Sequence, residues 1–446
     1  MDVFDCLIKN ISAVNENSIA NCNVYIKDGL ISTITPVNVI LNAGKIIDGT
    51  GRFLLPGVID DQVHFREPGL THKGEIFTES RAAVAGGVTS FMEMPNTNPQ
   101  TTTQEELELK FRLASEKSAA NFSFYIGATN SNLDELVKTD PKSVCGIKIF
   151  MGSSTGNMLV NDKKILSDIF KNAPLLIATH CEDDSIIKQN SDHYRNIYGE
   201  DVPVKFHGEI RSAEACFASS SLAAELAVKY NKHLHILHLS TEKELVLLEK
   251  KPLNEKLITA EVCVHHLWFD DRDYEKRGTF IKWNPAIKKE SDRDALLNAV
   301  NNNLIDVIAT DHAPHTKEEK NQTYFKAPSG GPLIQHSLVA MLELYHQGKI
   351  SLEQIANKMC HSPADLFRIE KRGYIREGYF ADLVIIDLND PWMVSEGNIL
   401  YKCKWSPFEG DIFRSKVTHT FVNGELAYEN GVVNDSVRGK RLLFNR

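Results

Sequence analysis

The chain has 446 residues, of which 42% are apolar and 24% are charged, and its formal net charge is -9. This length suits one large domain plus a smaller module, and the composition is that of an ordinary globular protein. Acidic and basic residues are interspersed, so the sequence offers no basic stripe for a nucleic acid, and a small anionic ligand would need local positive groups.

The eight cysteines are scattered and form no C-x-x-C pair, which is typical of reduced thiols. The N-terminal residues show no basic segment followed by an apolar run, and no apolar stretch is long enough to span a bilayer. We therefore expect a cytoplasmic protein without a membrane partner.

Both ends of the chain predict β structure. Residues 1–55 contain short strand patterns with a hairpin turn at Asp28-Gly29, and residues 372–446 show the same pattern with turns at Asn423-Gly424 and Asn430-Gly431. The segment 56–371 between them alternates strand and helix patterns. We therefore predict one small β domain built from both termini, with a larger domain inserted between its two parts.

The central segment predicts a TIM-like (β/α)8 barrel of the α/β class. Amphipathic stretches such as 101–119 and 209–230 predict helices between apolar, β-rich runs. Eight such runs are present, at 57–65, 88–94, 122–128, 146–152, 175–181, 234–240, 257–264 and 306–314. In such barrels the active site lies at the carboxyl ends of the strands.

Residues that bind metals fall at the end of one predicted strand after another: His64, Lys148, His180, His238 and Asp311. A single histidine at a strand end is more often a hydrogen-bonded core residue than a ligand. Five such positions on strands of one barrel, however, converge on one mouth. The pattern therefore predicts a zinc site formed by these five side chains.

Lys148 lies among apolar neighbours on a strand that faces the barrel interior. One interpretation is an ion pair with an acidic residue of the barrel. The other is that a desolvated amine of low pKa reacts with CO2 and becomes a carbamate that bridges two metals. The histidines at the other strand ends favour the carbamate.

Asp311, in the segment ATDHAPH at 309–315, ends the last strand. It could cap a following helix. The nearby His312 and His315 favour a second role, in which the carboxylate binds metal, takes a proton from the attacking water and returns it to a leaving nitrogen.

Several segments together resemble the dihydroorotases of the amidohydrolase superfamily. They are HFREPG at 64–69, MPNTNP at 94–99, KIFMGSSTG at 148–156, WNPAI at 283–287, ATDHAPH at 309–315 and GYIREGYFADLVIID at 373–387. The resemblance implies a distorted TIM barrel with a small composite β domain. It also implies zinc-dependent interconversion of dihydroorotate, a small anion, and N-carbamoyl-aspartate in pyrimidine biosynthesis.

Carried over by position, the resemblance makes the same five residues the metal ligands, with a modified Lys148 as the bridge. The substrate would contact Arg66, Asn96, Asn284 and His315 and the backbone of Ser329 and Gly330. The segment 316–332 would form a mobile loop over the mouth.

Arg66 distinguishes a dihydroorotase from other cyclic amide hydrolases. Its planar guanidinium suits a carboxylate bidentately, although an ion pair at the barrel rim is the alternative role. Allantoinases and dihydropyrimidinases or hydantoinases, which act on rings without that carboxylate, generally lack this arginine. A catalytically silent scaffold subunit of the same family is a third interpretation, and association of identical copies stays open.

Gln62 departs from the family pattern, because it stands where the H-x-H motif has its first histidine. An amide oxygen is a poorer zinc ligand than imidazole. We therefore expect a tight site at His180, His238 and Lys148 and a weaker one at His64 and Asp311. Strand alternation predicts that Asp61 faces away from the site and does not compensate.

Overall fold

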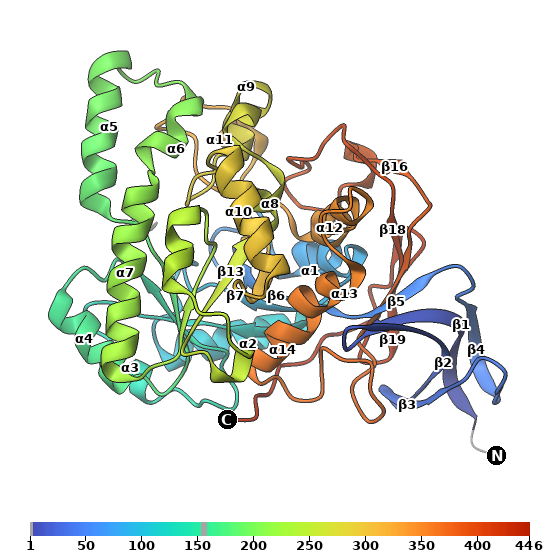
Figure 1. Cartoon of the computed structure of the whole chain (residues 1–446). Helices are drawn as coiled ribbons and strands as arrows, with labels where there is room; N and C mark the ends of the chain where they lie inside the picture. The colour runs from blue at the N-terminus through green and yellow to red at the C-terminus, as the bar shows by residue number, and fades with distance from the viewer. Residues whose placement is uncertain (1–2, 153–157) are drawn as a thin grey trace.

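The computed structural model describes residues 3–152 and 158–446, so the last residues of the KIFMGSSTG segment lie outside the described part (Figure 1). Its centre is a closed barrel of eight parallel strand positions, and all eight predicted strands form. The strands are β6 (Val58–Val63), β7 (Val88–Glu93), β8 (Asn121–Phe124) with β9 (Ile126–Gly127), β10 (Ile147–Phe150), β11 (Ile177–His180), β12 (Leu234–Ile236), β13 (Ile258–Cys263) and β14 (Val307–Ala309).

Two hydrogen-bonded sheets make up this barrel. One has the order β6-β7-β8, and the other runs β14-β13-β12-β11-β10-β9. Only Tyr125 separates β8 from β9, which joins the sheets on one side. On the other side a parallel bridge between Val63 and His312 closes the ring. All eight carboxyl ends therefore point to the same mouth.

Helices surround the barrel, as Figure 1 shows. The predicted helix in 101–119 forms as α2, where Thr103 and Glu106 make a reciprocal capping box, and Ser212 caps α7. None of the described helices is long and apolar enough to cross a membrane. The helices are α1 (Ile76–Ala85), α2 (Gln104–Lys117), α3 (Leu133–Val137), α4 (Lys163–Asn172), α5 (Asp184–Tyr198), α6 (His207–Ile210), α7 (Ala213–Tyr230), α8 (Val264–Trp268), α9 (Tyr274–Arg277), α10 (Glu290–Asn301), α11 (Lys317–Lys320), α12 (Ser337–His346), α13 (Leu352–Ala356) and α14 (Ser362–Phe367).

A second sheet lies beside the barrel and contains strands from both ends of the chain. Its order is β20-β19-β18-β15-β5-β1-β2-β3, with β4 paired to β1. Strand β15 runs antiparallel to β5, with Leu383 opposite Pro56. The predicted composite β domain is thus confirmed, while its boundaries at 55/56 and 371/372 stay predictions. The bounds are β1 (Phe4–Asn15), β2 (Ser18–Lys27), β3 (Leu30–Thr35), β4 (Ala43–Asp48), β5 (Phe53–Pro56), β15 (Leu383–Asp387), β18 (Lys416–Val422), β19 (Glu425–Glu429) and β20 (Val432–Val433), and a separate ribbon pairs β16 (Trp392–Met393) with β17 (Ile412–Phe413).

Two of the predicted hairpin turns touch each other. Asp28-Gly29 joins β2 to β3 and Asn423-Gly424 joins β18 to β19, and all four residues have positive φ. A Cβ on Gly29 would lie 2.8 Å from the carbonyl oxygen of Asn423. Glycine is therefore required both by the backbone conformation and by the close approach of the two turns.

The C-terminal segment covers the end of the barrel opposite the mouth. The backbone N–H of Leu442 donates to the carbonyl of Phe122 at 2.9 Å, at the start of a barrel strand. The side chains of Leu442 and Phe444 are buried in an apolar cluster with Tyr125. This end of the barrel is therefore filled with side chains.

Candidate active site

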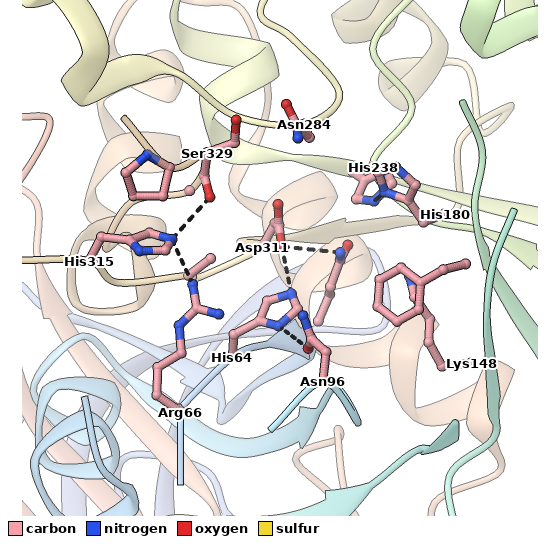
Figure 2. A pocket seen from close by; sticks show the side chains of 15 residues that line it. His64, Arg66, Asn96, Lys148, His180, His238, Asn284, Asp311, His315 and Ser329 are labelled. Atoms are coloured by element: carbon pink, nitrogen blue, oxygen red, sulfur yellow. Dashed lines mark hydrogen bonds and ion pairs between the residues drawn. The ribbon is translucent and has the colours of Figure 1, made fainter. Parts of the chain in front are cut away.

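A pocket opens at the carboxyl ends of the strands, and all eleven predicted site residues line it (Figure 2). Gln62, Phe150, Ala313 and Pro328 complete the lining. The predicted residues are His64, Arg66, Asn96, Lys148, His180, His238, Asn284, Asp311, His315, Ser329 and Gly330.

His180 and His238 face each other on one side of the pocket, as Figure 2 shows. Nδ1 of His180 lies 2.9 Å from Nε2 of His238. The other nitrogen of His180, Nε2, lies 3.0 Å from Oε2 of Glu182. A proton on Nε2, facing this carboxylate, leaves the lone pair of Nδ1 directed at His238, the arrangement in which a carboxylate orients a metal-binding histidine.

Glu182 is a residue that the sequence analysis missed. Its side chain is buried and forms an ion pair with Arg211. Burial alone would raise the pKa of Glu182, but Arg211 and His180 outweigh burial and lower this pKa to about 2. The signal in the sequence was its position two residues after His180, at the same strand end.

Lys148 lies on β10 with only 1% of its surface exposed. Its Nζ lies 4.6 Å from the ring centroid of Phe150, as expected for neighbours on one strand face. Burial lowers the pKa of Lys148 to about 8, although the carboxylates of Asp311 and Glu261 act in the opposite direction. Its amine is therefore more readily neutral, and more reactive, than that of an exposed lysine.

His64 is oriented by Asn96. Nδ1 of His64 lies 2.8 Å from Oδ1 of Asn96, and this oxygen can only accept, so Nδ1 bears the proton. The unprotonated Nε2 then faces Oδ1 of Asp311 at 3.2 Å. The same oxygen accepts a hydrogen bond of 3.2 Å from Nε2 of Gln62.

Asp61 does not line the pocket, as predicted. The alternation of side chains between the two faces of a strand does not explain its direction. The pairing of β6 with β7 shifts register between Asp60 and Val63. As a result Asp61 points into the barrel, where Oδ2 lies 3.2 Å from Nε2 of His235.

The opposite side of the pocket is positively charged. Arg66 is 7% exposed, donates from Nε to the carbonyl of Pro314 at 3.1 Å, and places Nη2 3.1 Å from Nε2 of His315. Nζ of Lys73 lies 3.1 Å from Nδ1 of the same ring. Burial and the charge of Arg66 hold the pKa of His315 well below its usual value, so the imidazole is neutral.

The remaining predicted residues differ in their contacts. Oδ1 of Asn284 is buried and has no hydrogen-bond partner among the described residues. The carbonyl of Ser329 lies 3.1 Å from Nε2 of His315. The N–H of Gly330 donates to the carbonyl of Lys282 at 2.8 Å, so this amide is already engaged.

The segment 316–332 lies at the mouth and is held together by a buried lysine, which also bonds to Lys282 outside the segment. Nζ of Lys320 donates to the carbonyls of Lys282, Pro328 and Gly330 at 3.2, 2.9 and 2.8 Å. Pro328, which follows in the same segment, lines the pocket. The predicted position of the loop is thus observed, while its mobility stays a prediction.

Comparison with known proteins places this arrangement in a family. Residues 53–427 match the model of the Amidohydrolase family, which covers the barrel and strands β5, β15 and β18 of the flanking sheet. The chain belongs to the amidohydrolase family.

Individual relatives of this amidohydrolase are cyclic amide hydrolases. The chain is 33% identical over 419 residues to a dihydroorotase from Methanosarcina acetivorans, covering 91% of this chain and 88% of that protein. It is 28% identical to an allantoinase from Bacillus velezensis, covering 96% and 95% of the two chains. The structure superposes on the L-hydantoinase (dihydropyrimidinase) from Arthrobacter aurescens with a TM-score of 0.92 at 27% identity, covering 97% and 98%.

Proposed function

We propose that this amidohydrolase is a zinc-dependent dihydroorotase, which interconverts dihydroorotate and N-carbamoyl-aspartate. The observation that supports this substrate best is the buried guanidinium of Arg66, which lies in the same pocket as the histidines and Asp311. A buried cation at this place needs an anionic partner, and a ring carboxylate supplies one.

The donor set fits zinc. Two imidazole nitrogens already converge at 2.9 Å in His180 and His238, and a carbamate on Lys148 would add an anionic oxygen ligand. His64 and Asp311 would form the second, weaker position. When bound, zinc polarises the amide carbonyl and lowers the pKa of a bound water.

The substrate is oriented from the other side. Arg66 holds the carboxylate through two parallel hydrogen bonds, and the neutral His315 contributes a polar contact beside it. The unpaired Oδ1 of Asn284 accepts a ring N–H. We assign Asn96 a contact with the ring in addition to its bond with His64, and Ser329 and Gly330 shape the wall through their backbone.

Asp311 carries the proton. Its carboxylate takes a proton from the attacking water and delivers it to the ring nitrogen that leaves as the amide bond breaks. In the direction of ring closure the same carboxylate removes the proton from the attacking carbamoyl nitrogen. The hydrogen bond from Gln62 holds one carboxylate oxygen in place for both directions.

A second candidate is hydrolysis of an uncharged cyclic amide, which the likeness to the L-hydantoinase and the allantoinase favours. Arg66 argues against it, because an uncharged ring leaves the guanidinium without an anion. A silent scaffold subunit is not favoured, since all five proposed ligands line the pocket.

The test is an assay of the purified, zinc-loaded protein with dihydroorotate, allantoin and dihydrouracil, combined with metal analysis. We expect turnover of dihydroorotate and little of the other two. Turnover of an uncharged ring alone would establish the second candidate. A protein that retains no zinc after loading and is inactive on all three rings would establish the scaffold.

We also propose a cellular location and binding partners for the enzyme. All eight cysteines are free and buried, which supports a cytoplasmic location. We propose a small anion as the binding partner, with neither nucleic acid nor membrane involved, and association into a homo-oligomer stays a prediction.

A further inference from the structure

Three side chains from three strands meet inside the barrel, apart from the pocket. Asp61 of β6, His235 of β12 and Glu261 of β13 have no exposed surface, and none of them lines the pocket. Nε2 of His235 lies 3.2 Å from Oδ2 of Asp61 and 3.5 Å from Oε2 of Glu261. One nitrogen and two oxygens, each from a different side chain, therefore lie within 4.8 Å of one another.

In the described structure, His235 is the partner that these two buried carboxylates share. Both carboxylate oxygens of Asp61, Oε2 of Glu261 and Nε2 of His235 are buried and make no hydrogen bond in the described structure. Among residues 3–152 and 158–446, neither carboxylate has an ion-pair partner other than His235. Two carboxylates in one buried space repel each other and favour a cation between them.

The hydrogen bonds of His235 determine which nitrogen faces the carboxylates with a lone pair. Nδ1 of His235 lies 2.9 Å from Oγ1 of Thr259, and this hydroxyl donates its own hydrogen to the carbonyl of Leu234 at 3.1 Å. The hydroxyl has only one hydrogen, so it accepts from Nδ1–H. Nε2 is then the atom free to bind a cation, as in histidines that bind metal through one nitrogen and donate from the other.

We propose that Asp61, His235 and Glu261 bind a divalent transition-metal ion, of the zinc or manganese class, at a site separate from the catalytic centre. Two ionised carboxylates and one dication form a neutral group, so a bound dication offsets the repulsion between Asp61 and Glu261. One imidazole and two carboxylates are a donor set that these metals accept.

The site also has a structural consequence. Oε1 of Glu261 accepts a hydrogen bond of 3.0 Å from the backbone N–H of His238, a residue held at a φ of 39°. A cation on the other oxygen fixes this carboxylate. It therefore stabilises the unusual backbone conformation that directs His238 into the pocket.

The direct test is a crystal of the wild-type protein, grown with zinc, measured on both sides of the zinc absorption edge. We expect an anomalous peak between Oδ2 of Asp61, Nε2 of His235 and Oε2 of Glu261, in addition to density in the pocket. Zinc in the pocket and no anomalous peak among these three atoms would overturn the proposal. This measurement needs no variant to fold.

Metal counting gives an independent readout. We expect Asp61→Asn to contain one metal equivalent fewer than the wild type after dialysis against zinc. Asp60→Asn is the matched control, because Asp60 is an adjacent buried carboxylate that accepts from Thr310 and does not contact the cluster. Equal metal content in a folded Asp61→Asn variant and in Asp60→Asn would contradict the proposal.

Discussion

The side-chain amide of Gln62 donates a hydrogen bond of 3.2 Å to Oδ1 of Asp311. Gln62, which the resemblance aligns with the first histidine of the H-x-H motif, therefore contacts a proposed ligand instead of supplying an imidazole. Its own oxygen, Oε1, faces the thiol of Cys263 at 4.0 Å. A metal held by His64 and Asp311 would thus have a weaker donor set than one held by His180, His238 and Lys148.

We predict that zinc titration of the wild type gives one tight and one weak site, or a single zinc per chain. Gln62→His should tighten the weaker site, because imidazole binds zinc better than an amide oxygen. Isothermal titration of zinc into the metal-free wild type and into metal-free Gln62→His measures the zinc affinity of each site. Two equally tight sites in the wild type would show that Gln62 has no such effect.

Arg66→Lys should keep the fold and the metal but lower kcat/KM for dihydroorotate about 10- to 100-fold. The reason is that an ammonium cannot replace the two parallel bonds of a guanidinium, and charged hydrogen bonds contribute about 1.5–3 kcal/mol. Arg272→Lys is the control, because Arg272 is exposed and does not line the pocket, and it should leave these kinetics unchanged. Steady-state kinetics equal to the wild type in Arg66→Lys would refute the assigned role.

Lys148→Ala should lose metal, and added short-chain carboxylic acids should restore part of it. We expect a carbamate signal from Lys148 after incubation with 13C-labelled bicarbonate, read by NMR. Lys358 is a matched control, since burial also lowers its pKa to about 8 but its Nζ donates to the carbonyl of Ile305 and lies outside the pocket. A bare Lys148 amine in density beside fully occupied zinc would exclude the carbamate.

Glu182→Gln should weaken zinc binding about 10- to 100-fold, because the carboxylate orients His180. Glu244→Gln changes another buried carboxylate, bonded to Ser220 and Thr241, and should leave zinc affinity unchanged. If both variants lost affinity equally, the effect would be one of general stability rather than of His180 orientation.

The buried ion pair between Lys110 and Glu93 should contribute to the free energy of unfolding. Nζ and Oε2 lie 2.9 Å apart with almost no exposure, and Lys110 also donates to the carbonyl of Met94. Lys110→Met leaves an unpaired buried carboxylate and should destabilise the fold by about 3–5 kcal/mol. Denaturant unfolding measures this, and the double variant Glu93→Gln/Lys110→Met should recover part of the loss. Equal stability of the wild type and Lys110→Met would contradict the prediction.

The parts of the site that the sequence predicted are those fixed by strand position. His64, Lys148 and Asp311 were found because each lies on a barrel strand or just past its end, where topology alone brings residues together. Contacts set by side-chain direction and local irregularity were not predictable. The bond from His64 to Asn96 depends on rotamers, and the inward direction of Asp61 follows from a register shift that strand alternation does not contain.

The antiparallel pairing of β5 with β15 has a consequence for how the protein is made. The whole barrel lies between these neighbouring strands in the sequence, so the N-terminal strands leave the ribosome long before the strand that completes their sheet. At about 5–20 residues per second this interval is on the order of tens of seconds. During it, β5 exposes an unpaired edge to the cell, a period in which a bound chaperone would protect the nascent chain from aggregation.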